Sequence, residues 1–177
     1  MFLWRLGDAR APAAAAVGGP FVLTDQNGHP FGDRDLRGRW VLLYFGYTYC
    51  PDVCPTTLAL MGAALEKLGP GAARIVPVFV SIDPARDTPP VMKAYVGQFG
   101  PRFVGLTGSA QDIAKVAHNY RVYYQKQPLK GGSYAMDHSS AIYLLDPEGR
   151  FVKAYDDQAG AAALAADLRK EIQGKSG

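Results

Sequence analysis

The stretch WVLLYFGYTYCPDVCPTT, residues 40–57, decides the fold of this chain. Its first part, residues 41–47, is apolar and rich in β-branched and aromatic side chains, which favours a strand buried on both faces. From Pro55 onward apolar residues recur at helical spacing, and proline is favoured where a helix begins because its missing N–H would be unpaired there anyway. The stretch therefore predicts a buried strand that turns directly into a helix.

Both cysteines of the chain, Cys50 and Cys54, lie at this strand-to-helix turn. Backbone N–H groups and the positive end of the helix dipole favour the thiolate form of the cysteines there. The negative charge of Asp52 favours the neutral thiol, and the sequence does not show which effect is larger. Two thiols at this spacing can converge to form a disulfide or to hold one soft metal ion. We expect the two sulfurs to lie close together and to be at least partly exposed. The alternative is a passive disulfide or a pair of inert core thiols.

The other segments continue an alternating α/β pattern. A second apolar run, residues 74–82, predicts a strand parallel to the first, which makes a right-handed βαβ unit. The order of segments predicts a thioredoxin-like α/β domain over residues 19–177, with an N-terminal β-hairpin and an inserted helix/strand segment. The expected strands are 21–24, 31–36, 103–106, 122–125, 140–145 and 151–155, the expected helices are 55–68, 90–99 and two further ones starting near 109 and 160, and residues 129–137 are expected to form a polar loop.

Composition excludes several classes of protein. The chain has 177 residues, 48% of them hydrophobic, which suits one globular domain. The net charge is +3 with the basic residues scattered, so nucleic-acid binding is not indicated. The apolar start, residues 1–5, is too short to span a bilayer or to act as a signal peptide. We expect residues 1–18 to be a tether, either the outer end of a membrane anchor that lies outside this sequence or an ordinary disordered start.

The cysteine pair needs further ligands to hold a metal. Two thiolates favour Cu(I) or Zn(II), but a structural zinc site usually has four protein ligands, and too few imidazoles are available here. His138, in DHSS, precedes an expected strand and is the best third ligand, although a lone histidine is more often an ordinary surface residue. His29 and His118 are expected to be solvent or packing residues. Met136 is a possible soft ligand, although methionine usually fills gaps. Asp83, Arg86 and Asp87 could line the site, although an Asp-Pro loop is often only a turn.

Four segments resemble signatures of the Sco family of copper chaperones, also called SenC or PrrC: GGPFVLTDQNG, LRGRWVLLYFGYTYCPDVCPTTL, FVSIDPARDTP and DHSSAIYLLDPEGRF. The resemblance spans residues 18–155, and three residues separate the cysteines where thioredoxins have two. It implies one copper, as Cu(I) and Cu(II), bound by Cys50, Cys54 and His138. It also implies a membrane-tethered domain on the periplasmic face of the bacterial inner membrane. This domain would assist assembly of the binuclear copper A centre in cytochrome c oxidase subunit II and would be loaded by a copper-donating chaperone.

The same two cysteines are also compatible with a second function, thiol–disulfide exchange. Cys50 and Cys54 could exchange disulfides with the cysteines of the oxidase, which needs a thiolate and access but no histidine. A peroxidase on the same scaffold is a weaker third reading. We expect a metallochaperone rather than an enzyme, and His138 is the residue that separates the two main alternatives.

Overall fold

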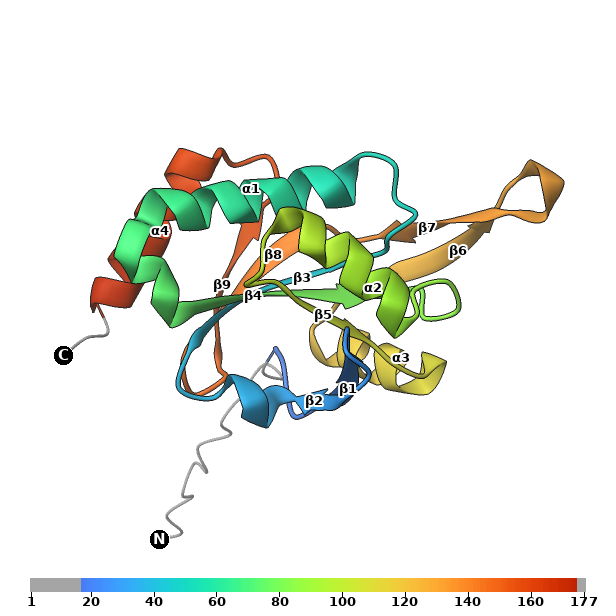
Figure 1. Cartoon of the computed structure of the whole chain (residues 1–177), viewed down its shortest axis with the longest axis horizontal. Coiled ribbons are helices and arrows are strands. Elements are labelled where there is room, and N and C mark those ends of the chain that lie inside the picture. The colour runs from blue at the N-terminus through green and yellow to red at the C-terminus, as the bar shows by residue number, and fades with distance from the viewer. Residues whose placement is uncertain (1–16, 175–177) are drawn as a thin grey trace, which may run out of the picture.

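A seven-stranded mixed sheet forms the centre of the protein, which is represented by a computed structural model that describes residues 17–174. The strand order is β2-β1-β5-β4-β3-β8-β9, and Figure 1 shows the sheet running through the middle of the molecule. A separate two-stranded sheet is formed by β6 (Tyr124–Pro128) and β7 (Tyr134–His138). The strands of the large sheet are β1 (Val22–Asp25), β2 (Pro30–Gly32), β3 (Trp40–Gly46), β4 (Ile75–Ser81), β5 (Val104–Thr107), β8 (Ala141–Leu145) and β9 (Phe151–Asp156).

Four α-helices cover the sheet within the part of the chain that the structure describes. They are α1 (Val53–Leu68), α2 (Pro89–Val96), α3 (Ala110–Asn119) and α4 (Ala161–Gly174). In Figure 1, α1, α2 and α4 lie on one face of the sheet and α3 lies on the other. Because both faces are covered, every residue of β3 and of β4 is buried, as their continuous apolar sequences predict.

The sheet topology places three segments at one edge. β3 and β4 are parallel, from the Trp40–Ile75 pair to the Gly46–Ser81 pair, so their carboxyl ends meet. β8 runs antiparallel to β3, with Tyr44 opposite Ile142. The amino end of β8 therefore lies beside the carboxyl end of β3. This edge is where ligands bind in open α/β sheets, and here it brings the segment before β8 next to the cysteine-bearing turn.

The thioredoxin-like layout with its N-terminal hairpin is confirmed, but several expected segments differ in detail. Residues 31–36 do not continue as a strand, because β2 ends at Gly32 and a 3₁₀ helix, Asp33–Leu36, follows. The helix after the cysteine motif begins at Val53 rather than at Pro55. Pro55 is accommodated because the first N–H groups of a helix have no partner within the helix.

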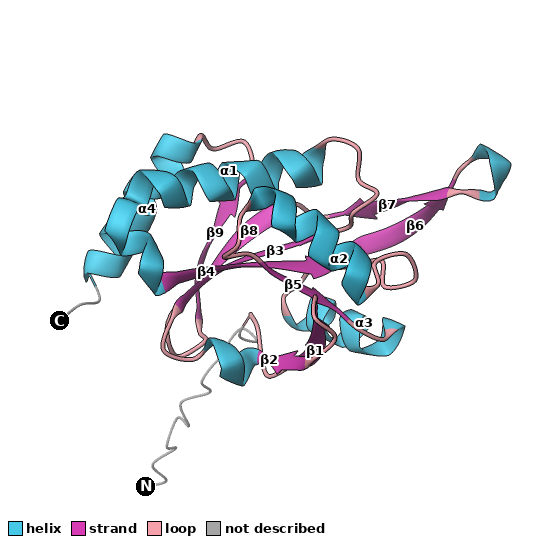
Figure 2. Ribbon diagram, viewed as in Figure 1, coloured by secondary structure: helices cyan, strands magenta, loops and turns pink. Residues whose placement is uncertain are grey.

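The expected polar loop at residues 129–137 is wrong. The chain forms a hairpin there, in which β6 leads through a short 3₁₀ turn, Lys130–Gly132, into β7. Figure 2 shows this hairpin extending beyond the end of the large sheet. His138 consequently ends a strand, β7, and does not follow a loop as expected; it still precedes β8. The polar composition concealed the strands because neither face of the hairpin is fully buried.

The amino-terminal prediction falls mainly on residues 1–16, which lie outside the described residues. At their border, the Gly18 N–H donates to the carbonyl oxygen of Asn119 over 2.8 Å. Among residues 17–174, no helix combines the length and the apolar character that crossing a bilayer requires.

Candidate metal centre

The two cysteines occupy different environments at the start of α1. Cys50 is half-buried in the turn before the helix, and its sulfur accepts a hydrogen bond from the backbone N–H of Cys54 over 3.4 Å. Cys54 lies in the first turn of the helix and is fully buried. The expectation that both sulfurs are partly exposed is therefore wrong for Cys54, because the helix start turns its side chain onto the sheet.

The surroundings separate the pKa values of the two thiols. The pKa of Cys50 is lowered to about 4, chiefly because the Cys54 thiol donates a hydrogen bond to it, with further donation from His138 and from the backbone N–H groups of Cys54 and Asp52. The pKa of Cys54 is raised, because it supplies that hydrogen bond and because it is buried. The sequence left the thiolate balance at this turn open, and the hydrogen bond from the second thiol contributes most to lowering the Cys50 pKa. Cys50 carries the thiolate at neutral pH.

A glycine makes room for the buried sulfur. A Cβ atom placed on Gly46 would lie 2.6 Å from the Cys54 Sγ and 2.9 Å from the ring of Phe79. The hydroxyl of Tyr44 lies 3.9 Å from the same sulfur. Sequence reasoning missed Gly46 and Tyr44, because their role depends on the helix closing over the end of β3, which no local pattern shows.

His138 reaches the cysteines from the end of β7. Its Nδ1 lies 3.0 Å from the carbonyl oxygen of Ser139, which can only accept, so Nδ1 carries the proton in the neutral ring. In this neutral form Nε2 carries the lone pair that a metal would take, and Nε2 lies 3.5 Å from the Cys54 Sγ. In the protonated ring, Nε2 donates a hydrogen bond to the Cys50 thiolate instead. Burial lowers the pKa of His138, but the hydrogen bond to Cys50 and the bond to Ser139 outweigh burial, and the net shift is upward.

The three side chains converge on one point. One ligand atom from each of Cys50, Cys54 and His138 lies within 4.8 Å of the other two. Two sulfur donors and one imidazole nitrogen form a soft, three-ligand set, and such a set favours copper or zinc over hard cations. The imidazole orientation is fixed through its second nitrogen, as is usual for histidine ligands.

The acidic loop after β4 supports the site rather than lining it. Asp87 is fully buried and accepts hydrogen bonds from the backbone N–H of Thr48 over 3.0 Å and from the hydroxyl of Ser81 over 2.6 Å. Burial raises the pKa of Asp87. Because Thr48 stands two residues before Cys50, this carboxylate anchors the turn that carries the thiols.

The other sequence candidates lie elsewhere. His29 is exposed in the turn between β1 and β2, and His118 is exposed on α3, as expected of solvent residues. Met136 is partly buried on β7 and lines a hollow of about 410 Å³ under the hairpin.

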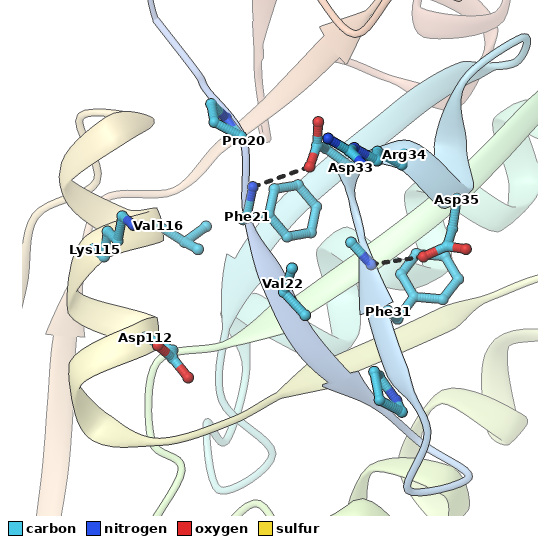
Figure 3. A pocket seen from close by; sticks show the side chains of 12 residues that line it. Pro20, Phe21, Val22, Phe31, Asp33, Arg34, Asp35, Asp112, Lys115 and Val116 are labelled. Carbon is cyan, nitrogen blue, oxygen red and sulfur yellow. Dashed lines mark hydrogen bonds between the residues drawn. The ribbon is translucent and has the colours of Figure 1, made fainter.

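A larger hollow of about 580 Å³, drawn in Figure 3, lies between β1, β2 and α3. Its lining contains no cysteine or histidine, and two of its carboxylates hold local backbone: Asp33 accepts from the N–H of Phe21, and Asp35 accepts from the N–H of Gly32. The soft ligands of the chain are therefore gathered at the carboxyl end of β3 and not in this hollow. The residues drawn around it include Pro20, Val22, Phe31, Arg34, Asp112, Lys115 and Val116.

A thioredoxin-like domain with two cysteines and one histidine at the end of its central strand defines a class of small thiolate–imidazole metal-site proteins. The sequence profile of the SCO1/SenC family matches residues 9–173, and the chain belongs to that family. It is 43% identical over 160 residues to the mitochondrial protein SCO1 homolog 1 of Arabidopsis thaliana, covering 90% of this chain and 48% of that protein.

Solved structures agree with this assignment. The copper-bound ScoI of Arabidopsis thaliana matches with a TM-score of 0.86 and 43% identity, covering 90% of this chain and 99% of that one. The copper-bound ScoI of Bradyrhizobium japonicum matches with a TM-score of 0.82 and 48% identity, covering 88% and 99%. The chain spans about half to two thirds of the length of the first curated relatives, at 48%, 64% and 56%.

Proposed function

We propose that this chain is a copper metallochaperone that binds one copper ion through Cys50, Cys54 and His138. The observation that carries the proposal is the convergence of the three ligand atoms within 4.8 Å. Similarity to Sco proteins solved with copper bound supports the choice of metal. Thiolates supply most of the affinity for Cu(I), and the imidazole completes the coordination and contributes more to Cu(II), which prefers nitrogen donors more strongly.

The biological role follows from the family. We propose that the copper is delivered during assembly of the binuclear copper A centre of cytochrome c oxidase subunit II, and that a copper-donating chaperone loads the site. The domain would act at the periplasmic face of a bacterial inner membrane, held by an N-terminal anchor. The half-buried Cys50 leaves one side of the site open to a partner, which suits transfer by ligand exchange.

A second candidate function rests on the same thiols. Cys50 has a pKa of about 4 and is accessible, while Cys54 is buried beside it. This is the arrangement of an attacking and a resolving thiol, so reduction of a partner disulfide is chemically available. Exchange alone does not need His138, whereas copper binding does.

Replacing His138 with alanine tests the proposal. We expect the visible sulfur-to-Cu(II) charge-transfer band to be abolished or strongly shifted, while part of the Cu(I) binding is retained, because both thiolates remain. The measurement is titration of the reduced protein with each copper ion, followed by absorption. His118→Ala, which removes an exposed histidine of α3, is the matched control. An unchanged Cu(II) spectrum and affinity in His138→Ala would show that the histidine is not a ligand, and disulfide exchange would become the better account.

Copper affinity is also expected to rise with pH. The raised pKa of Cys54 keeps this thiol protonated across the neutral range, whereas bound copper requires the thiolate. Binding therefore releases the Cys54 proton and, below the raised pKa of His138, an imidazolium proton as well. Each unit of pH from 6 to 8 should strengthen Cu(I) binding by at least about ten-fold. Competition with a Cu(I) chelator at three pH values measures the slope. A pH-independent affinity would contradict the protonated state of Cys54.

A further inference from the structure

The loop that follows β4 contacts both halves of the candidate metal centre. On one side, Asp87 holds the backbone N–H and the hydroxyl of Thr48, two residues before Cys50. The same carboxylate accepts from Ser81 at the end of β4, and the backbone N–H of Asp87 donates to the carbonyl oxygen of Asp83 over 2.9 Å. The loop is therefore fixed to the sheet and to the cysteine-bearing turn.

On the other side, Arg86 binds the hairpin that carries His138. The Nε of Arg86 donates to Asp83 Oδ2 over 2.6 Å, and its Nη1 donates to the carbonyl oxygen of Tyr134 over 2.9 Å. The hydroxyl of Tyr134 donates back to Asp83 Oδ1 over 2.7 Å. These three bonds form a closed ring between the loop and the first residue of β7.

Aromatic rings complete the contact. The guanidinium carbon of Arg86 lies 3.7 Å from the ring centre of Tyr134 and 4.3 Å from that of Tyr49. Tyr49 immediately precedes Cys50, so the guanidinium lies against one ring from the hairpin and one from the cysteine turn. Only 16% of the Arg86 side chain is exposed, and partial removal from water strengthens both cation–π contacts.

The hairpin needs such an attachment. A two-stranded hairpin is marginally stable by itself in water, and β6 and β7 pair only with each other. In Figures 1 and 2 it extends past the end of the large sheet. The hollow of about 410 Å³ beneath it is lined by Tyr134 and Met136, so the core does not fill the space under β7. Tyr47 provides one further contact, because its ring lies edge-on to the ring of His138 with 5.8 Å between the ring centres.

We propose that Arg86, held by Asp83, is a positioning residue that clamps β7 against the loop after β4 and thereby sets the position of His138 over the two cysteines. His138 is the last residue of the strand whose first residue Arg86 holds. A ligand displaced by about 1 Å no longer satisfies the site, so the clamp organises the third ligand before copper arrives. The Nη2 of Arg86 is buried without a hydrogen-bond partner among residues 17–174.

Two readouts test the clamp, and only one of them rests on the proposed function. In metal-free Arg86→Gln, we expect amide hydrogen exchange at Ala135 and Asp137 to accelerate by about ten-fold, because their N–H groups lie in the hydrogen-bonded register of the hairpin and β7 opens locally. In the copper-loaded protein, we expect Cu(II) affinity to fall about 10- to 100-fold with a changed charge-transfer band, as for other residues that orient a metal ligand. Cu(I) affinity should change much less, because the cysteine turn keeps its own hydrogen bonds. If exchange accelerates and copper does not bind even the parent protein, the clamp stands and the proposed function fails.

Three further variants make the outcome decisive. Arg102→Gln is the matched control, because Arg102 also bonds backbone carbonyl oxygens, those of Ala72 and Ile75, but at the opposite end of β4. Equal effects of Arg86→Gln and Arg102→Gln on both readouts would overturn the proposal. Arg86→Lys keeps the charge but loses the planar guanidinium that bonds Asp83 and Tyr134 from two separate nitrogens and stacks on the aromatic rings, so full rescue by lysine would also overturn it. Tyr134→Phe removes only the hydroxyl bond to Asp83 and should raise the amide exchange rate of β7 by a smaller factor than Arg86→Gln does. If both variants exchange at the parental rate, the hairpin is held by other contacts and the proposal is wrong.

Discussion

Replacing Cys54 with serine is expected to remove high-affinity copper binding in both oxidation states. The Cys54 sulfur is at the centre of the site: it is fully buried, it lies 3.5 Å from His138 Nε2, and it donates the hydrogen bond that stabilises the Cys50 thiolate. A serine hydroxyl keeps the size and that hydrogen bond but is not a soft ligand. A four-ligand zinc site contributes about 10–16 kcal/mol, so loss of one ligand is worth about 3 kcal/mol, or roughly 100-fold in affinity.

The measurement is competition for Cu(I) against a chelator, with Cu(II) followed by its charge-transfer band. The control is the fold: because the metal does not form part of the core, the thermal midpoint of the metal-free variant should stay close to that of the parent. Alkylation of the remaining Cys50 should stay fast, since its hydrogen-bond donors are preserved. Parental Cu(I) affinity in Cys54→Ser would exclude the buried sulfur as a ligand. Cys54→Ser abolishes disulfide exchange as well, so the comparison with His138→Ala separates the two functions.

Replacing Gly46 with alanine is expected to damage the site and the fold together. The new Cβ would lie 2.6 Å from the Cys54 sulfur and 2.9 Å from the Phe79 ring, both closer than real contacts allow. Either the sulfur moves, which displaces a ligand, or β3 moves away from α1. Overpacking of this kind costs about 1–3 kcal/mol of stability, and a displaced ligand costs at least about ten-fold in copper affinity.

Chemical denaturation and copper competition on the same sample measure the two effects. Gly62→Ala is a suitable comparison, because the Cβ would meet its nearest neighbour, the carbonyl oxygen of Phe99, at 3.4 Å. Alanine also stabilises a helix relative to glycine by up to about 1 kcal/mol, so this variant should keep both stability and copper. If Gly46→Ala binds copper as the parent does, then the space left by the missing side chain of Gly46 does not determine the position of the Cys54 sulfur.

Much of the site was predictable because it depends on residue type and on the local sequence pattern. The two cysteines are the only soft thiolate donors in the chain, and their place between an apolar run and a helical pattern puts them at a strand-to-helix turn. The parallel pairing of β3 and β4 followed from two continuous apolar segments joined by one helix, because such strands must be covered on both faces. The N-terminal hairpin and the β8–β9 hairpin followed from turn residues between apolar segments.

The hairpin β6–β7 was predicted only in part, because the expected strand at 122–125 overlaps β6 but residues 129–137 were expected to form a loop. Its strands are polar and glycine-rich at the tip, so neither alternation nor a long apolar run marks them. What holds the hairpin is the ring of bonds among Asp83, Arg86 and Tyr134, whose members are separated by up to 51 residues in the chain. A bond of that range is decided by topology and not by local preference.

The sequence by itself determined the ligand types and the strand-to-helix turn. Ligand chemistry is a property of single residues, and the periodicity of strands and helices is a property of neighbouring residues. The tertiary structure alone decided how unlike the two thiols are and how the imidazole reaches them. Burial of Cys54 and the low pKa of Cys50 arise where α1 closes over Gly46, and the position of His138 arises where β8 runs antiparallel to β3. Burial, electrostatic environment and approach direction depend on which distant segments pack together, and only the folded chain specifies that.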